Sequence, residues 1–500
     1  MRRLLRLLKR SLSPDGDLTS RTVVSGLWVA FTNGGNRVLE TVMLVVMARL
    51  LSPADFGLFG IAMIALSAFK RFSRLGLDTA LIQRKDENVD AYLDTAFTLQ
   101  ILRGIAIAAV AYLSAPFVAP FFDEPQAELL LRVLAIATLF ETLYNPGRVY
   151  FEKDLAFHKQ FVFSLSGTLP RVVVSIGYAL FVEATVWALA VGFIAGNVVR
   201  MLTSYAIHDY RPWPRFNRTY AGEIIGYGKW ILGSSMVSFL YSEGDDIFVG
   251  RVLGSGALGA YQLAYQLSNA PATEISHTIS RVAMPAYSKV QDDTAALREG
   301  FYRVLRLSSL VSLPVGVGIA VVAPVFVPVF LGDGWEAMIV PMQILAGFGL
   351  LRSVRTCTSP LFNAVGRPDY GAKLHALRLA VLAVAIYPLT TAFGLPGTSL
   401  AVLVTSAVGL PVAAWLALRI VDDDLRSLAA PIVFPAFGSV VMGGCALFAR
   451  RAVTETAGMF VGFVATVLTG VVVYALVMFA LEQRFDIGLN DLVGQVRGSL

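Results

Sequence analysis

Residues 456–481 read TAGMFVGFVATVLTGVVVYALVMFAL and contain no Asp, Glu, Lys or Arg. Two further stretches, residues 307–332 and 427–449, are also free of these charged residues. About 20 apolar residues in an α-helix span the hydrocarbon core of a bilayer. Each of the three stretches therefore predicts a helix that crosses a membrane.

The composition extends this prediction to the whole chain. Of its 500 residues, 56% are hydrophobic and 15% are charged, and the mean hydropathy is +0.66. A soluble domain has about 25% charged residues, so a soluble protein of this size could not cover its surface with so few charges. The same numbers exclude a disordered chain, a collagen-like chain and a disulfide scaffold. We predict an all-α polytopic membrane protein.

The hydrophobic pattern predicts about fourteen transmembrane helices. The uncharged run at residues 379–418 is too long for one crossing, and Gly and Pro between Thr391 and Gly397 favour a turn that divides it into two helices. With span lengths set by the thickness of the bilayer, the spans are predicted at residues 23–48, 56–80, 93–121, 127–149, 161–182, 184–207, 226–250, 256–282, 303–331, 335–357, 371–392, 396–418, 430–450 and 457–481.

The basic residues predict the orientation of these helices. With the N-terminus inside, 31 of the 41 Lys and Arg residues fall in cytoplasmic segments, and four fall in outer loops, namely Arg49, Arg251, Arg450 and Arg451. Cytoplasmic loops carry an excess of Lys and Arg. We therefore expect both termini to be cytoplasmic. The N-terminal MRRLLRLLKR is expected to lie on the anionic inner leaflet or to fray, and it is not read as a cleaved signal peptide.

The chain repeats part of its sequence. Residues 47–59 resemble residues 249–261 at an offset of 202, which places Gly57 on Gly259. A weaker match relates residues 115–120 to 323–328 at an offset of 208. Because each copy contains an even number of spans, the two copies would have the same orientation, and parallel repeats are a transporter architecture.

The repeat predicts how the chain is organised. The expected regions are a basic cytoplasmic segment (1–22), an N-terminal lobe of six helices (23–208), a basic and aromatic cytoplasmic linker (209–225), a C-terminal lobe of six helices (226–420), two further helices (430–482) and a cytoplasmic tail (483–500).

Five motifs resemble those of bacterial polysaccharide transporters, the oligosaccharide flippase branch of the multidrug/oligosaccharidyl-lipid/polysaccharide exporter superfamily. They are ARLLSPADFGLFG (48–60), DDIFVGRVLGSGALGAYQLAYQL (245–267), ISRVAMPAYSKVQDD (279–293), GDGWEAMIVPMQILA (332–346) and FNAVGRPDY (362–370). The resemblance implies a V-shaped pair of six-helix lobes around a central cavity that opens alternately to each side of the bacterial cytoplasmic membrane. The implied substrate is an oligosaccharide on a polyprenyl diphosphate, and a polysaccharide polymerase or assembly proteins are further candidate partners.

Charged residues inside the predicted spans indicate a hydrated pathway, because a charge at mid-bilayer is costly and usually faces a cavity or a partner. On the first span, Asn33, Asn36, Arg37 and Glu40 have spacings compatible with one polar helix face. The functional interpretation is that arginines hold the diphosphate bidentately. The alternative for Arg37 is a local pair with Glu40.

Further candidates lie on other helices. Arg103 and Arg171 interrupt the third and fifth spans, where a structural ion pair or an interfacial position is the alternative. Asp245 and Asp246 in the seventh span, together with Glu40, are candidates for ion coupling, and the alternative is that the two aspartates cap a loop. Arg352 is a cavity candidate, or else an anchor at the inner edge.

The sequence gives no indication of catalytic residues, a metal site, a cofactor or nucleic-acid binding. Cys357 and Cys445 lie in apolar stretches, the four histidines are scattered, and the nearest approach to a phosphate-binding loop, Gly226 to Lys229, lacks the full pattern. We therefore predict a transporter. The alternative is an ion-coupled multidrug antiporter of the same superfamily, and a membrane enzyme is a distant third, because the outer loops are too short to carry its active site.

Overall fold

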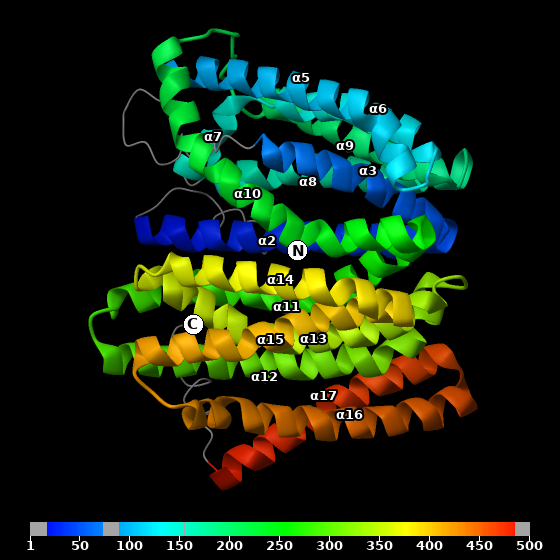
Figure 1. Ribbon diagram of the computed structural model, residues 1–500, viewed down its shortest axis with the longest axis vertical. Coiled ribbons are helices and arrows are strands. Elements are labelled where there is room, and N and C mark those ends of the chain that lie inside the picture. Colours follow the sequence, from blue (N-terminus) through cyan, green and yellow to red (C-terminus); the bar gives the residue numbers. More distant parts are fainter. Residues whose placement is uncertain (1–17, 74–89, 155, 486–500) are drawn as a thin grey trace, which may run out of the picture. The chain divides into compact units, whose positions relative to one another are not determined.

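The computed structural model describes residues 18–73, 90–154 and 156–485, and the regular secondary structure in these residues is helical (Figure 1). The predicted N-terminal segment and C-terminal tail fall mostly outside them. The described residues form fourteen helices of 17 residues or more: α2 (Leu18–Leu50), α3 (Pro53–Phe72), α5 (Asp90–Phe121), α6 (Gln126–Thr142), α8 (Phe157–Phe181), α9 (Val186–Ala206), α10 (Arg218–Leu253), α11 (Ser255–Lys289), α12 (Thr294–Phe326), α13 (Ile339–Ala364), α14 (Pro368–Phe393), α15 (Leu395–Val421), α16 (Ala429–Ala457) and α17 (Met459–Phe485).

Each predicted span coincides with one of these helices. Nine of the described helical segments are long and apolar enough to cross a membrane by length and composition, so the chain is an all-helical, multi-pass membrane protein. The turn predicted between Thr391 and Gly397 is confirmed, because α14 ends and α15 begins at Gly394, whose φ of 62° is one that a residue with a side chain rarely adopts.

Several predicted boundaries differ from the structure by seven residues or more. Helix α3 ends at Phe72 instead of continuing to residue 80, and α6 ends at Thr142 instead of 149. The latter end precedes Pro146, which has no N–H to continue the helix and instead opens the short 3₁₀ helix η1 (Pro146–Arg148). Helix α10 begins at Arg218, so the second half of the predicted linker is helical.

The chain forms two compact units, Met1–Gly259 and Ala260–Leu500. In unit 1, α8 packs between α2 and α9, α5 packs on α6, and α10 packs on α3. In unit 2, the pairs α12–α13, α14–α15 and α16–α17 pack along their lengths, and α12 also packs on α16. The division at the linker, which the sequence repeat predicts, differs from the division into compact units because α10 packs within unit 1.

The ARLLSPADFGLFG motif contains the start of α3. Ser52 is the N-cap of this helix: its hydroxyl accepts a hydrogen bond from the Asp55 N–H (3.3 Å), and Asp55 Oδ2 accepts one from the Ser52 N–H (3.0 Å). The other carboxylate oxygen, Oδ1, accepts a hydrogen bond from the N–H of Val186, the first residue of α9, at 3.1 Å. One carboxylate therefore caps two helices of unit 1.

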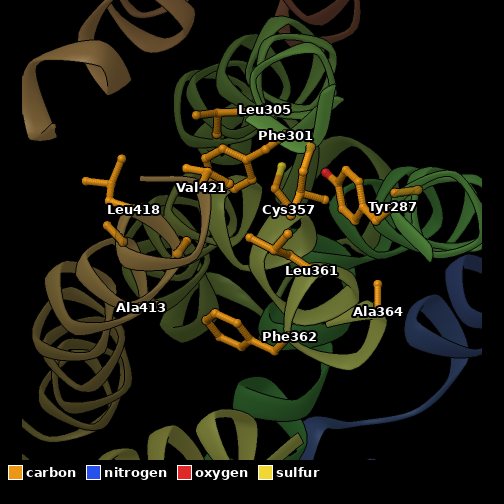
Figure 2. Packing of buried hydrophobic residues seen from close by; sticks show 14 of the residues in the cluster. Tyr287, Phe301, Leu305, Cys357, Leu361, Phe362, Ala364, Ala413, Leu418 and Val421 are labelled. Atoms are coloured by element: carbon orange, nitrogen blue, oxygen red, sulfur yellow. The ribbon is translucent and has the colours of Figure 1, made fainter. Parts of the chain in front are cut away.

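Two further motifs supply the core of unit 2 (Figure 2). Tyr287 of the ISRVAMPAYSKVQDD motif and Phe362 of the FNAVGRPDY motif are almost fully buried, together with Phe301 and Cys357. The ring of Tyr370 packs edge-on against Phe362, with 5.6 Å between the ring centroids. Cys357 is buried in this apolar cluster as its sequence context predicts. These motif residues therefore pack α11, α12, α13 and α14 together.

Large apolar side chains remain exposed on the helices that follow this core. Phe448 on α16 and Val471 and Phe479 on α17 are exposed by 63 to 76%. Soluble proteins seldom expose contiguous apolar surface of this kind, whereas a helix that faces lipid tails requires it. This surface is consistent with α16 and α17 as membrane helices.

Candidate functional site

The candidate site is built on the interface between α8 and α9 in unit 1. Helix α9 carries the sequence Gly192-Phe-Ile-Ala-Gly196, a spacing of small residues that lets two membrane helices approach closely. A Cβ atom on Gly196 would lie 2.6 Å from the carbonyl oxygen of Gly167 on α8, and one on Gly192 would lie 2.7 Å from the carbonyl oxygen of Arg171. Only glycine permits this contact.

Two arginines lie at this interface, Arg171 on α8 and Arg200 on α9. The side chain of Arg200 lies over Gly167, where any Cβ would overlap its guanidinium, and one of its terminal nitrogens donates to the Ser164 carbonyl at 3.3 Å. Arg200 also lies over the ring of Phe163, 5.9 Å from its centroid. The absence of a side chain at Gly167 therefore makes room for the Arg200 guanidinium.

Neither arginine is neutralised by a hydrogen-bonded carboxylate within the part of the chain that the structure describes. The Nε atoms of Arg171 and Arg200 are both buried and have no hydrogen-bond partner there. Glu40 on α2 is the carboxylate whose charge acts on Arg171, and Arg200 acts on it with the opposite sign. Both side chains are half-buried, and two partly desolvated cations without a hydrogen-bonded anion are costly.

A third cation, Lys70 near the end of α3, faces the same region. The ring of Phe193 on α9 lies near both cations: its centroid is 5.8 Å from Lys70 Nζ and 5.9 Å from the Arg171 guanidinium carbon. Unlike the arginines, Lys70 is paired, with 2.7 Å between its Nζ and Glu141 Oε2 on α6. The Asn197 amide lies 3.4 Å from Glu141 Oε1.

The polar network continues through Tyr144, whose hydroxyl donates to Asn197 Oδ1 at 3.2 Å. This hydroxyl interacts electrostatically with both Arg200 and Glu141. Asn197 and Arg200 are three positions apart and therefore lie on one face of α9. We call Lys70, Glu141, Tyr144, Asn197, Arg171 and Arg200 the unit 1 polar cluster.

The polar face predicted on the first span borders this cluster. Asn36 donates a hydrogen bond of 2.6 Å to the hydroxyl of Ser164, which also lies next to Arg200. Asn33 and Glu40 are exposed, and Arg37 is half-buried. No hydrogen bond or ion pair joins Arg37 to Glu40 among the described residues, so the alternative of a local pair is not seen here.

The remaining predicted site residues lie elsewhere. Arg103 holds the end of α3, because its guanidinium donates to the Lys70 carbonyl (2.8 Å) and to the hydroxyl of the C-cap Ser73 (3.1 Å). Asp245 on α10 is buried and Asp246 is half-buried. Near them, Glu243 pairs with Arg71 at 3.2 Å. The side chain of Arg352 lies outside the described residues.

The sequence did not predict five members of the cluster: Lys70, Glu141, Tyr144, Asn197 and Arg200. Arg200 and Glu141 are charged residues inside predicted spans, so the rule that selected Arg171 would also have selected them. Lys70 lies near the end of its helix, where the positive-inside rule already accounts for a basic residue. The Gly192–Gly196 spacing was a further signal for the α8–α9 interface.

The charges of the unit 1 polar cluster and the neighbouring Glu40 do not balance. With Lys70, Arg171 and Arg200 against Glu40 and Glu141, positive charge is in excess. Guanidinium groups present a planar fork of N–H donors that matches phosphate oxygens. No group of three or more metal-binding side chains occurs among the described residues.

A comparison with known protein families assigns the chain to one of them. Residues 46–340, more than half of the chain, match the model of a family described as polysaccharide biosynthesis protein. The chain belongs to this family. The resemblance drawn from the sequence motifs is thereby confirmed.

Curated relatives agree with this family assignment. The lipopolysaccharide biosynthesis protein WzxC of Escherichia coli K12 is 27% identical over 367 residues, which are 72% of this chain and 73% of that protein. The teichuronic acid biosynthesis protein TuaB of Bacillus subtilis 168 is 26% identical, over 74% of this chain and 76% of its own. The probable flippase AglR of Haloferax volcanii is 20% identical over 89% of this chain and 92% of its own length.

Solved structures show that this member of the polysaccharide biosynthesis family has a transporter fold. The lipid II flippase MurJ in an inward closed conformation aligns with a TM-score of 0.72 over 92% of this chain and 99% of its own, at 14% identity. An inward-facing multidrug resistance MATE transporter of the MOP superfamily aligns with a TM-score of 0.59 over 76% of this chain and 95% of its own, at 16% identity. At these identities the likeness concerns the fold alone.

Proposed function

We propose that the protein translocates an oligosaccharide linked to a polyprenyl diphosphate from the inner to the outer face of a bacterial cytoplasmic membrane, for the biosynthesis of a surface polysaccharide. Family membership supports the biosynthetic role. The names of its relatives, which include a lipopolysaccharide biosynthesis protein and a probable flippase, support the flippase activity.

The observation that carries the proposal is the pair of arginines, Arg171 and Arg200, neither of which is hydrogen-bonded to a carboxylate among the described residues. A multidrug antiporter for cations, the alternative within the superfamily, requires a site rich in negative charge. The unit 1 polar cluster has the opposite sign. A diphosphate brings about two negative charges and several acceptor oxygens, which fit two guanidinium forks.

The proposed pathway uses fourteen membrane crossings, arranged as two six-helix repeats and two C-terminal helices, with both termini in the cytoplasm. The two repeats would open the substrate pathway alternately to each face. Asn33, Arg37 and Glu40 are proposed to line the pathway beside the cluster, and Glu40, Asp245 and Asp246 remain candidates for ion coupling.

The membrane potential can contribute to the direction of transport. An inside-negative potential favours the outward movement of an anion by about 2.3 kcal/mol per charge for every 100 mV. For the two charges of a diphosphate this amounts to about 4–5 kcal/mol. Such a contribution requires only that the charged headgroup crosses the membrane in a polar pathway.

The test is a flipping assay with the purified full-length protein in proteoliposomes and a labelled polyprenyl-diphosphate oligosaccharide. Hydrogen bonds to charged groups contribute about 1.5–3 kcal/mol, so Arg171→Lys or Arg200→Lys, which keeps the charge and loses the fork, should lower the flipping rate roughly tenfold or more. The matched control is Arg132→Lys on α6, because Arg132 pairs with Glu128 at 2.8 Å and lies outside the cluster.

Two results would contradict the proposal at different levels. Normal flipping by the Arg171→Lys, Arg200→Lys double variant would refute the anion site at these arginines but would leave the proposed flippase activity standing. The second result is obtained in a deletion strain that lacks a paralogue. Normal surface polysaccharide in this strain, with no lipid-linked saccharide retained on the inner face, would refute the proposed flippase activity.

A further inference from the structure

The chain between α9 and α10, residues 207–217, is held in place by side chains of α5. Asp94 Oδ1 accepts hydrogen bonds from the Tyr210 hydroxyl at 2.6 Å and from the Trp213 N–H at 3.1 Å. One turn further along α5, the Thr98 hydroxyl donates to the Arg215 carbonyl at 2.9 Å. The first turns of α5 therefore fix the backbone of this linker.

A second set of contacts fixes the beginning of the same linker. The side-chain amide of Asn145 donates to the Tyr210 carbonyl at 2.7 Å, and His208 Nδ1 accepts from the Tyr210 N–H at 3.0 Å. The imidazole of His208 stacks on the ring of Tyr150, with 5.8 Å between the centroids and 9° between the planes. The linker is thus an ordered part of unit 1.

The anchoring leaves one set of side chains pointing away from the unit. Trp213 and Phe216 are 69% and 58% exposed. Arg215 is exposed, and its guanidinium has no hydrogen-bond or ion-pair partner within the described part of the chain. Arg211 is also exposed and donates to the carbonyls of His208 and Tyr210.

The linker has charges of both signs near its start and only positive charges where its aromatic residues lie. Asp209 and Asp154 act on His208 at the start of the linker, where Lys159 and Arg211 act on it with the opposite sign. From Arg211 to Asn217 the sequence RPWPRFN contains two arginines and no acidic residue. Aromatic and basic side chains therefore alternate along an exposed, acid-free segment.

The position of the linker limits what it can meet. It follows directly on α9, which is long and apolar enough to span a membrane, and it ends where α10 begins at Arg218. A short connection at the end of a membrane helix lies at the level of the lipid headgroups. Trp side chains prefer this level, and basic residues there are attracted to anionic lipids by about 1 kcal/mol each.

We propose that residues 211–217 form a binding surface for anionic phospholipid headgroups, in which Arg215 contacts the lipid phosphate and Trp213 and Phe216 insert between neighbouring lipids. Because Asp94 and Asn145 already order the backbone, lipid binding need not order it again. The surface shares no residue with the unit 1 polar cluster, so the proposal does not depend on the proposed transport activity.

The experiment uses the full-length protein in nanodiscs of phosphatidylcholine, with or without phosphatidylglycerol. A photo-activatable phosphatidylglycerol and a matched phosphatidylcholine are crosslinked in turn, and lipid adducts are mapped by mass spectrometry. We expect adducts on residues 211–217 to be several-fold more abundant with phosphatidylglycerol. Arg215→Gln should reduce this excess about fivefold, and high salt should reduce it in the wild type.

Two variants separate charge from positioning. Arg303→Gln on α12 is the matched control, because Arg303 is an exposed arginine paired with Glu299 at 3.1 Å, and it should leave adducts at 211–217 unchanged. Asp94→Asn keeps every charge of the segment but weakens its anchor, and should reduce the adducts while circular dichroism shows a folded protein. Equal labelling by the two lipids, or an excess that survives Arg215→Gln, would overturn the proposal. A segment that neither lipid labels would also overturn it and would point to a protein partner.

Discussion

Gly57 and Gly259 lie against each other in unit 1. A Cβ atom on Gly57 would be 3.0 Å from the backbone nitrogen of Gly259, and one on Gly259 would be 2.8 Å from the backbone nitrogen of Gly57. Each Cβ would also overlap a carbonyl oxygen, that of Ser255 for Gly57 and that of Pro53 for Gly259. Gly57 corresponds to Gly259, and Pro53 to Ser255, at the repeat offset of 202. The contact therefore has an approximate two-fold symmetry.

A second correspondence between the two predicted six-helix repeats concerns the start of the third long helix of each, α5 and α12. In unit 1, Asp94 near the start of α5 holds the chain that leaves α9. In unit 2, Arg298 near the start of α12 donates to the carbonyl of Val421 at 2.9 Å, where the chain leaves α15. The hydrogen-bonding role is reversed, because the side chain is an acceptor in one half and a donor in the other. In both halves, however, it holds the chain where it leaves the sixth helix.

We expect Gly57→Ala to be strongly destabilising, because the added methyl group meets rigid backbone atoms instead of a movable side chain. Overpacking costs about 1–3 kcal/mol, and here it exceeds the gain of up to about 1 kcal/mol that alanine brings to a helix. The measurement is the thermal unfolding of the protein in detergent. Gly256→Ala, at a helical site with no atom within 4 Å of the added Cβ, should be neutral or slightly stabilising. Equal unfolding temperatures for the two variants would contradict the prediction.

Gly167→Ala should lower the flipping rate more than it lowers the amount of folded protein. The new methyl group would occupy the place of the Arg200 guanidinium and force it to move. Gly177→Ala is the control on the same helix, since its Cβ would meet nothing within 4 Å. Flipping and protein abundance are measured in parallel for both. Wild-type flipping by Gly167→Ala would show that the position of Arg200 does not matter.

Asp55→Ala should cost more stability than the loss of an ordinary helix cap. Removing one N-cap costs about 0.5–2 kcal/mol, and Asp55 serves both α3 and α9. The comparison is Asp293→Ala, since Asp293 caps α12 alone, by accepting from the N–H groups of Ala295 and Ala296. Unfolding by denaturant should show a larger loss for Asp55→Ala, and an equal or smaller loss would refute the role at α9.

Acid should loosen the linker at His208. Burial and the charge of Lys159 hold the pKa of His208 below its usual 6.5, so the folded state prefers the neutral imidazole, whose Nδ1 accepts from Tyr210. The stability from this contact is complete above pH 6.5 and falls as the pH drops from there toward the lowered pKa. Hydrogen exchange of the Tyr210 amide, corrected for the intrinsic pH dependence, should therefore show less protection at pH 5.5 than at pH 7.5. In His208→Gln this pH dependence should disappear.

The membrane helices could be predicted from the sequence because an apolar run of sufficient length has few alternatives. Their ends were harder to predict. The end of α3 at Phe72 coincides with a cap from Arg103, which comes from the next long helix and leaves no local signal. The end of α6 was signalled by Pro146 and by the polar Glu141, Thr142 and Asn145 before it, but a span length set by the bilayer extended the prediction past them.

The candidate site was predicted only in part, for a related reason. Hydrophobic context identifies Arg171 as an unusual residue, but it does not say which charges will neutralise it. Lys70 and Glu141 are 71 residues apart, and nothing in either local sequence indicates their pairing. Arg37 and Glu40 have the spacing of an ion pair and do not form one among the described residues, because helical spacing brings two side chains near each other without fixing their rotamers.

The bond between Asp55 and Val186 also affects the order of assembly. The two residues are 131 positions apart, and a ribosome adds about 5–20 residues per second. For roughly 7–26 seconds, therefore, the third residue of α3 is in the membrane before its second partner has been made. During this interval three more long helices must be inserted while the Asp55 carboxylate lacks one of its native hydrogen bonds. A membrane chaperone that assists insertion would act on this partly inserted chain, in which Asp55 is not yet bonded to Val186.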